Sequence, residues 1–288
     1  MSDVQIKKLD YPSASGIEFY DGKLYVIGDD ATNLLVLDSN LNIVDSIPII
    51  DYPGRRIPKD IKPDIEAVAL RDDNLFVFGS GSLSPYRNSG WKLNLKEIER
   101  YSYSLDLEPL YSKVKGWGID QINIEGACFI KEQLILVNRG NKGYPANHLI
   151  ITDESFSVKD SSFQVFLIPF VAQKDTASFK GISGLCYAKQ TDQLIMTVST
   201  EDTRNSYDDG AIGKSYLWIV NNISNKLSSK TLTPDKIIDL EEIDPRFKNQ
   251  KLESVTVIGE TNDLILLALV ADNDDGSSTI CRMSIKKD

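Results

Sequence analysis

The chain has 288 residues, of which 41% are hydrophobic and 26% are charged, and its formal net charge is −10. This length and apolar content suit one folded domain, so we expect residues 1–288 to form a single domain. The negative charge argues against nucleic acid and against an anionic membrane surface as partners, since binding to either depends on basic residues. There is no apolar stretch of about 18 residues and no signal-like start, so we expect a cytoplasmic protein without a membrane anchor.

The first strand is expected at residues 4–9, where apolar and polar residues alternate weakly before Tyr11 and Pro12. Four short strands follow, near residues 17–20, 23–28, 33–38 and 43–49. A polar connection then leads to a second copy of the same strand–turn–strand pattern, which begins near Ile65.

After this second copy, three more copies begin near residues 123, 180 and 251. In the second copy, residues 101–105 are expected to form the third strand, and residues 108–115 form either a short helix or a poor outer strand. The last copy ends after its third strand, at residues 279–285. It therefore lacks an outer strand, which residues 4–9 can supply.

Each copy opens with an apolar residue, then Glu or Ser, then a small residue or the next strand residue. The five phrases are Gly16-Ile17-Glu18, Ile65-Glu66-Ala67, Ile124-Glu125-Gly126, Ile182-Ser183-Gly184 and Leu252-Glu253-Ser254. A repeat of roughly 50–70 residues that contains hairpins is typical of a propeller. We predict an all-β, five-bladed β-propeller with four-stranded antiparallel blades, closed by the N-terminal strand pairing with the last blade.

The Glu or Ser positions are expected to converge at one mouth of the central channel, which the first strand of each blade lines. They are Glu18, Glu66, Glu125, Ser183 and Glu253, with Ser15 as an alternative in the first blade. Gathered carboxylates repel each other unless protonation, hydrogen bonds or a cation offsets their charge. Because these ligands are all oxygens, we expect one Ca²⁺ ion in the channel. The alternative is that the glutamates bind backbone N–H groups of the next blade and act as clips between blades.

The loops after the second strands are expected at the same mouth. They carry Asp29 and Asp272, which are candidates for a general base. Candidate ligand-binding residues are Arg55, Arg87, Arg139, Arg204, Ser80, Ser82 and Asn141. Arginines beside a cation suit a phosphate or carboxylate, so we expect a small anionic or phosphorylated ligand, with ordinary solvated loop charge as the alternative.

The remaining reactive residue types offer little chemistry. Cys128, Cys186 and Cys281 lie in apolar strand segments and are expected to be buried, reduced thiols. His148 is the only histidine, which excludes a histidine-cluster metal site and makes zinc a poor choice.

Two resemblances can be drawn from these residues. Residues 64–67, residues 79–82 with Arg87, and residues 123–126 with residues 139–141 resemble an uncharacterised family of bacterial β-propeller proteins. That resemblance implies the fold and no established activity.

The second resemblance rests on the order Glu66, Glu125, Ser183 and Glu253, which is similar to the calcium-activated nucleotidase (apyrase) family. It implies one Ca²⁺ in the central tunnel and hydrolysis of nucleoside di- and triphosphates. The first blade departs from that family, which uses Ser-Asp where this chain offers Ser15 or Glu18.

Three functions remain open. The first is a binding module whose metal is structural and whose mouth holds a small anion. The second is a calcium-dependent, apyrase-like phosphohydrolase. The third is a lactonase or esterase similar to the gluconolactonase-type metal propellers, although those usually have six blades and use Asn and Asp ligands.

Overall fold

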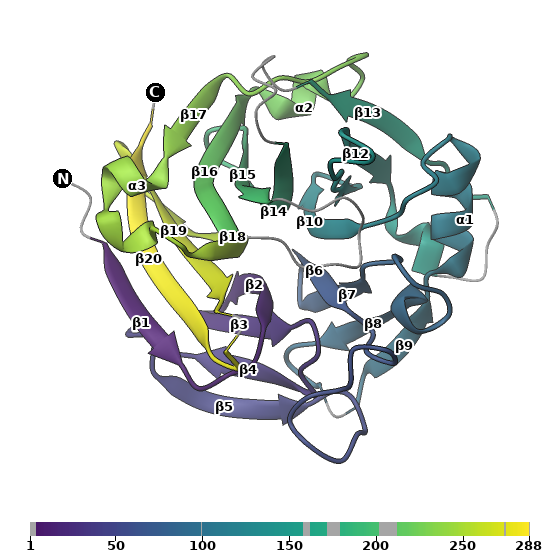
Figure 1. Ribbon diagram of the computed structural model, residues 1–288, viewed down its shortest axis with the longest axis horizontal. Helices are drawn as coiled ribbons and strands as arrows, with labels where there is room; N and C mark the ends of the chain where they lie inside the picture. Colours follow the sequence, from purple (N-terminus) through teal and green to yellow (C-terminus); the bar gives the residue numbers. More distant parts are fainter. Residues whose placement is uncertain are drawn as a thin grey trace.

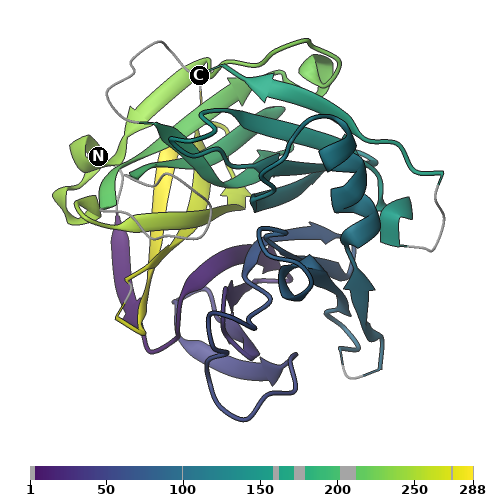
Figure 2. The ribbon, with the colours of Figure 1, turned by 45° about the vertical axis from the view of Figure 1, so that its right-hand side comes forward.

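The computed structural model describes residues 4–98, 100–157, 162–171, 179–201, 212–273 and 275–287. Five four-stranded sheets form a ring around a central axis, and neighbouring strands within each sheet are antiparallel (Figure 1). Figure 2, turned by 45°, shows the twist of the sheets around the ring. The five-bladed β-propeller predicted from the repeats is confirmed.

The strands follow the chain outward from the axis in four of the blades. Blade one contains β2 (Ala14–Tyr20), β3 (Lys23–Gly28), β4 (Asn33–Leu37) and β5 (Ile43–Pro48). Blade two contains β6 (Ile65–Arg71), β7 (Asn74–Gly79), β8 (Ser89–Asn94) and β9 (Ser102–Asp106). Blade three contains β10 (Ile124–Ile130), β11 (Gln133–Asn138), β12 (Asn147–Thr152) and β13 (Phe166–Phe170). Blade four contains β14 (Lys180–Ala188), β15 (Gln193–Glu201), β16 (Ile212–Asn221) and β17 (Lys236–Asp239).

Blade five is assembled from both ends of the chain. It contains β18 (Lys251–Glu260), β19 (Leu264–Asp272) and β20 (Ser278–Lys286), and its outer strand is β1 (Gln5–Leu9). Strand β1 runs antiparallel to β20, with Gln5 opposite Arg282 and Leu9 opposite Ser278. The predicted closure by the N-terminal strand is therefore confirmed, and it covers the edge that β20 would otherwise expose.

Short helices lie in the connections between strands. They are η1 (Tyr86–Asn88), α1 (Glu108–Gly116), η2 (Glu154–Ser157), α2 (Ile223–Lys226), α3 (Leu240–Ile243) and η3 (Pro245–Phe247). In the part of the chain that the structure describes, none of the helices has the length and apolar character needed to cross a membrane.

The hydrophobic core lies between the blades, because the second strand of each blade is buried on both faces. In β11, Leu134 and Leu136 pack towards blade two, whereas Ile135 and Val137 pack towards blade four. A strand covered on both faces needs a continuous apolar run rather than strict alternation, which is why these strands were recognisable in the sequence. All three cysteines are buried and free, as expected.

Blade two departs from the prediction in one place. Residues 101–105 were expected to form its third strand, but the third strand is β8 and residues 102–106 form the outer strand β9. Strand β8 is hard to recognise because Gly90 interrupts it, and a Cβ atom at Gly90 would lie 3.0 Å from a methyl group of Leu107. Residues 108–116 form helix α1, the first of the two alternatives for that segment.

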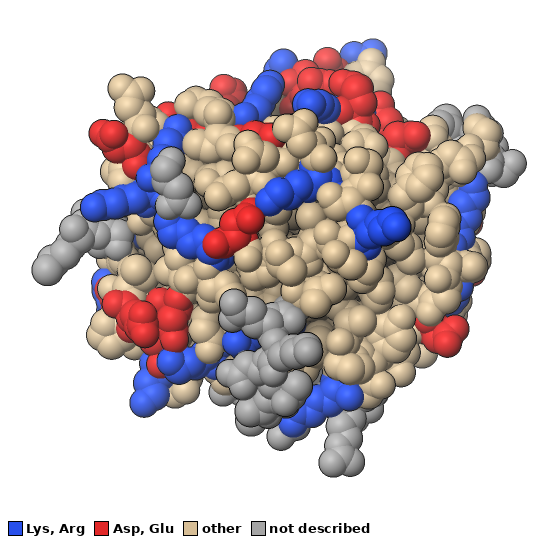
Figure 3. Space-filling view, turned by 90° about the horizontal axis from the view of Figure 1, so that it is seen from above, with Lys and Arg blue, Asp and Glu red and all other residues tan. Residues whose placement is uncertain are grey.

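The surface carries charges of both signs. Figure 3 shows one side of the ring, where lysine and arginine side chains lie interspersed with aspartate and glutamate around broad neutral areas. The net charge of −10 is therefore not gathered into one acidic field on this side.

Candidate functional site

A β-bulge near the start of every inner strand builds the channel mouth. The register of each inner strand shifts by one residue, and the bulged residues are Ser15, Glu66, Glu125, Ser183 and Glu253. A bulge takes one residue out of the ladder and re-aims its side chain, so these five positions are structurally equivalent. The predicted ring exists in four blades as expected, and in the first blade it contains the alternative residue, Ser15.

Glu18 is not part of this ring, which corrects the alignment of the first copy. It lies three residues further along β2, opposite Tyr25. Its carboxylate accepts hydrogen bonds from the Leu70 backbone N–H at 3.2 Å and from the Thr256 hydroxyl at 3.1 Å. Burial raises the pKa of Glu18 to about 7, although these two hydrogen bonds act to lower it. Glu18 thus connects blade one to both of its neighbours inside the channel.

The two serines of the ring act as clips between blades. Ser15 donates its hydroxyl proton to the carbonyl oxygen of Ile65 at 2.5 Å, and Ser183 donates to that of Leu252 at 2.6 Å. In both cases the acceptor belongs to the inner strand of the next blade. These serine contacts link neighbouring blades through carbonyl oxygens, whereas the clip expected from the sequence, a glutamate that accepts from a backbone N–H of the next blade, is made by Glu18 with Leu70.

Two of the ring glutamates receive a donor from the residue two positions earlier. Asn123 Nδ2 donates to Glu125 Oε1 at 2.6 Å, and Lys251 Nζ lies 2.9 Å from Glu253 Oε1. Arg139 Nη1 also lies 3.4 Å from both carboxylate oxygens of Glu125. The charges of Glu125 and Glu253 are thus compensated inside their own blades.

Glu66 has the opposite environment, because the residue two positions earlier is Asp64. One carboxylate oxygen from each of Asp29, Asp64 and Glu66 lies within 4.8 Å of the others. Burial raises the pKa of Glu66 well above its ordinary value, and the charges of Asp64 and Glu125 raise it further. No hydrogen bond or ion pair to the Glu66 side chain is found among the described residues. We refer to Asp29, Asp64 and Glu66 as the carboxylate cluster.

Lys62 and Arg87 hold the other two members of the cluster. Lys62 Nζ bonds to Asp29 Oδ2 and lies 2.8 Å from Asp64 Oδ1, while Arg87 Nη1 lies 2.6 Å from Asp64 Oδ2. Although burial acts to raise it, Lys62 and Arg87 hold the pKa of Asp64 below its ordinary value. For Asp29 burial outweighs Lys62 and raises the pKa to about 6. Three carboxylates therefore share two cations.

The predicted anion-binding residues lie in different places. Arg87 and Arg139 are buried and directed at Asp64 and Glu125, so their guanidinium groups balance charges of the protein itself. Arg55 lies on an outer loop, where its side chain pairs with Asp10. Arg204 falls outside the described residues.

The small polar candidates are also used within the protein. Ser80 and Ser82 both donate to Asp64 Oδ2, at 2.6 and 3.3 Å. Asn141 donates to Gln121 and accepts from the backbone N–H groups of a tight turn. These contacts position the carboxylate cluster and the loops around it.

Sequence reasoning missed Asp30, Lys62 and Asp64 as site residues. Asp64 was visible in the repeated phrase, where its offset of two residues before Glu66 matches that of Asn123 before Glu125. Lys62 and Asp30 carry no comparable signal, because the loops that hold them differ in length between blades.

A pocket of about 550 Å³ opens beside the cluster, at the side of blades one and five. Its lining includes Asp29, Lys62 and Lys251 from the mouth, and Asp272 from the end of β19. Both candidate bases, Asp29 and Asp272, therefore face one cavity.

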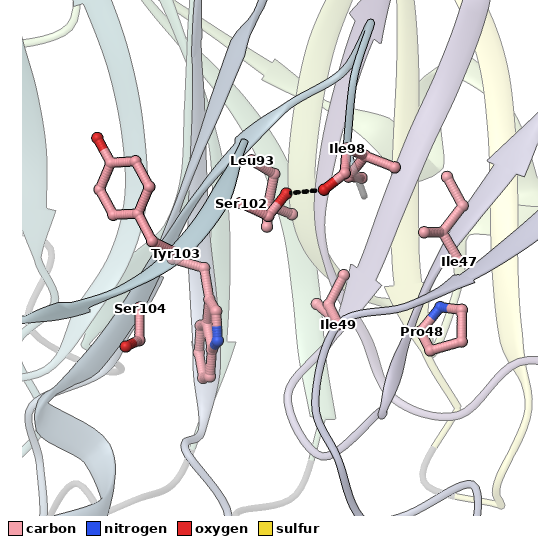
Figure 4. Close-up of a pocket in the computed structure, with 9 residues that line it drawn as sticks. Ile47, Pro48, Ile49, Leu93, Ile98, Ser102, Tyr103 and Ser104 are labelled. Carbon is pink, nitrogen blue, oxygen red and sulfur yellow. Dashed lines mark hydrogen bonds between the residues drawn. The ribbon is translucent and has the colours of Figure 1, made fainter. Parts of the chain in front are cut away.

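A second hollow lies on the outer rim between blades one and two (Figure 4). It measures about 490 Å³, and its walls are mainly the apolar side chains of Ile47, Ile49, Leu93 and Ile98. A hydrogen bond from Ser102 to the carbonyl oxygen of Ile98 crosses the loop beside it. This hollow is lined by no carboxylate or basic side chain, which distinguishes it from the pocket at the channel mouth.

The match that decides the family spans residues 10–285, which fit the model of a family of unknown function (DUF6929). The chain belongs to the DUF6929 family. The expected resemblance to an uncharacterised family is confirmed by this match. A search of the curated protein sequences gave no match.

Solved structures similar to this DUF6929 protein share its fold. The glutaminyl cyclase of Myxococcus xanthus aligns with a TM-score of 0.52 and 11% identity, over 99% of this chain and 97% of that one. Virginiamycin B lyase from Staphylococcus aureus aligns with a TM-score of 0.46 and 12% identity, over 99% of this chain and 100% of that one. At such low identity the similarity to the glutaminyl cyclase supports the overall fold alone.

Proposed function

We propose that this protein is a small-ligand-binding propeller whose carboxylate cluster binds a divalent cation, with Ca²⁺ as the best-fitting ion. The observation that carries the proposal is the approach of Asp29, Asp64 and Glu66 to within 4.8 Å of one another at the channel mouth. Like charges gather at such distances only when something offsets their repulsion, and a metal ion is one of the groups that can.

The chemistry of the donors supports calcium. All three cluster residues offer carboxylate oxygens, which Ca²⁺ accepts in flexible geometry and in high coordination number. Mg²⁺ demands near-ideal octahedral geometry and gives up water reluctantly, so it suits this protein-lined mouth less well. Glu66 adds a ligand to which no described lysine or arginine forms a hydrogen bond or a close ion pair.

A small anionic ligand would bind through the ion in this proposal. Arg87 and Arg139 already pair with carboxylates of the protein. The anion would therefore bind at coordination positions of the cation that the protein does not fill. This differs from the direct arginine clamp expected from the sequence.

The first experiment measures the melting temperature of chelator-treated protein titrated with Ca²⁺ and, separately, with Mg²⁺. Binding to the folded state stabilises it by about 2.7 kcal/mol at one hundred times the dissociation constant. We expect a Ca²⁺-selective rise that Glu66→Gln reduces and that Glu97→Gln leaves intact, because Glu97 is an exposed residue paired with Arg100. If neither ion moves the melting temperature of the wild-type protein, the cation proposal is wrong.

A second variant tests the role of Lys62 in the same titration. Its ammonium group already occupies a position between Asp29 and Asp64 and competes with a metal for their oxygens. Lys62→Met should therefore lower the melting temperature without metal and enlarge the rise that Ca²⁺ produces. A smaller rise than in the wild type would contradict this arrangement.

A calcium-dependent hydrolase is the second candidate, and one observation favours it. Asp29 and Asp272, the two candidate bases, line the same pocket next to the carboxylate cluster. A bound cation would polarise a phosphate or ester oxygen, while a carboxylate of this pair accepts the proton of the attacking water. Hydrolysis of a nucleoside diphosphate that needs Ca²⁺ and is lost in Asp272→Asn supports this activity; hydrolysis that survives chelation counts against it.

A further inference from the structure

The pocket beside the channel mouth has a feature that the proposed cation site does not use. Besides Asp29 and Lys62, which also belong to the channel mouth, its charged lining comes from Asp30, Arg56, Lys59, Lys251 and Asp272. Both signs of charge are present, and Asp30 lies outside the carboxylate cluster. The pocket is therefore a second location where a ligand can be recognised.

Two carboxylate oxygens in this wall are buried without a donor. Asp29 Oδ1 and Asp30 Oδ1 have no hydrogen-bond partner among the described residues. The Asp30 side chain is only 8% exposed, and its other oxygen, Oδ2, accepts from Arg56 Nε at 2.7 Å. A buried acceptor left unpaired costs about 1–3 kcal/mol, so a rotation of the Asp30 carboxylate that brings this oxygen to a donor in the pocket recovers that cost.

The backbone holds these two side chains in place. The Asp29 N–H donates to Ser13 at 3.0 Å, and its carbonyl accepts from Ile65 at 3.1 Å. The Asp30 carbonyl accepts from the N–H of Ile57 at 2.8 Å. Because both peptide units are fixed between neighbouring segments, the two residues are held in the wall of the pocket.

The chemistry of the wall selects the class of ligand. Unpaired carboxylate oxygens accept from N–H or O–H groups, and an ammonium group adds charge attraction that a hydroxyl lacks. Arg56 lies at the rim of the same pocket with its side chain 52% exposed, and arginine favours carboxylates. A molecule that carries an ammonium group beside a carboxylate can pair with both the acidic wall and Arg56.

A divalent metal fits this part of the wall less well than an ammonium group. Asp30 lies outside the carboxylate cluster and already contacts the Arg56 guanidinium. This positive charge adjoins the unpaired Asp30 oxygen and opposes a doubly charged ion more strongly than a singly charged one.

We propose that this pocket binds an α-amino acid, with its ammonium group donating to the buried Asp30 carboxylate and its carboxylate directed at Arg56. Asp29 contributes the second acceptor in the same wall. The site shares Asp29 with the cation site, while its two principal contacts, Asp30 and Arg56, lie outside the carboxylate cluster.

The experiment is calorimetric titration of the full-length protein at neutral pH with free L-amino acids and with their N-acetyl derivatives. Acetylation removes the positive charge and two of the donors while keeping the carboxylate. We expect at least one free amino acid to bind and its N-acetyl form to bind at least tenfold more weakly. Absence of binding by every free amino acid, or equal binding of an acetylated pair, overturns the proposal without any use of variants.

A matched pair of variants locates the site. Asp30→Asn removes the charge from the buried pair with Arg56, and Asp10→Asn does the same to the exposed pair with the adjacent Arg55. We expect Asp30→Asn to weaken amino-acid binding at least tenfold and Asp10→Asn to leave it unchanged. Equal affinities in the two variants, with folding of both verified by circular dichroism, would place the ligand elsewhere and overturn the assignment.

The two proposals fail separately. Glu66→Gln should reduce the Ca²⁺ response and leave amino-acid binding intact, because Glu66 does not line this pocket. Asp30→Asn should weaken amino-acid binding and leave the Ca²⁺ response intact. A protein that binds amino acids but shows no metal response therefore refutes the cation site and leaves the pocket assignment standing.

Discussion

At the scale of single residues, the position two places before each ring residue governs the charge of the mouth. Asn123 and Lys251 supply donors to the glutamates of their blades, whereas Asp64 adds a like charge beside Glu66. The same repeat thus produces two compensated glutamates and one cluster with surplus negative charge. Function concentrates where the repeat departs from its own pattern.

Glu18 gives a pH prediction that is independent of this cluster. Its pKa in the folded protein is raised to about 7, from an unfolded value near 4.5, chiefly by burial. The folded state therefore binds the proton more tightly than the unfolded state does, and stability falls as pH rises between about 4.5 and about 7. The loss is fully developed at alkaline pH and absent in acid.

Glu18→Gln removes this titration while keeping an acceptor for the Leu70 N–H and a polar group for Thr256. As pH rises from 4.5 to 8, we expect the free energy of unfolding of the variant to increase relative to that of the wild type, by a few kcal/mol at most. Denaturant unfolding at each pH measures this difference. At pH 4 the two proteins should differ least. A constant difference across this range would show that the Glu18 carboxyl does not titrate there.

Residue identities at the mouth were only partly visible in the sequence. Glu66, Glu125, Ser183 and Glu253 follow from the repeated phrase, because each stands directly after its apolar residue and is the bulged residue of its strand. Glu18 was mistaken for the first-blade member, since Gly16-Ile17-Glu18 imitates the phrase while the bulge lies at Ser15. The pairing of arginines with carboxylates depends on side chains from different loops, which spacing does not specify.

At the scale of elements, the inner strands approach one another most closely through glycines. A Cβ atom at Gly184 in β14 would lie 2.6 Å from the carbonyl oxygen of Glu253 and 2.8 Å from Cα of Ser254 in β18. A Cβ atom at Gly126 in β10 would lie 2.9 Å from Cα of Gly184. These glycines allow three neighbouring bulges to converge at the axis.

Gly184→Ala should therefore destabilise the protein, because backbone atoms that cannot rotate away surround the new methyl group. We expect a loss of about 1–3 kcal/mol, which corresponds to a fall of several degrees in melting temperature. Gly116→Ala at the end of α1 is the control, since nothing lies within 4 Å of its added methyl group. If both variants melt alike, the blades do not pack as closely at the axis as described.

The elements themselves were predicted best where burial is complete. Strands such as β7 and β11 are apolar on both faces, so their sequences are continuous and easily recognised. Strand β8 escaped recognition because Ser89, Gly90 and Lys92 dilute its apolar residues. Its place in the sheet comes from pairing with β7, a tertiary effect that local pattern does not encode.

At the scale of the whole molecule, the ring closes by noncovalent contacts between its two ends. Strand β1 pairs with β20 over five residues, and Val4 packs in the core between blades four and five. Beyond the ladder, Ser278 donates to the Tyr11 carbonyl at 2.7 Å and Arg246 donates to the Val4 carbonyl at 2.8 Å. Segments more than 240 residues apart are thereby joined within one sheet.

Closure makes the stability of every blade depend on β1, because an open ring exposes the edge of β20 and loosens the packing of blade five against blade one. Deletion of residues 1–10 should lower the melting temperature of the whole protein and speed amide hydrogen exchange in β18, β19 and β20 first. Deletion of residues 1–3 alone, which leaves β1 intact, is the matched control and should melt as the full chain does. Unchanged melting after removal of residues 1–10 would mean that the inter-blade cores hold the ring without its closing strand. Because hydrophobic cores remain between the other blades, we expect unfolding to begin in blade five and to reach the other blades later.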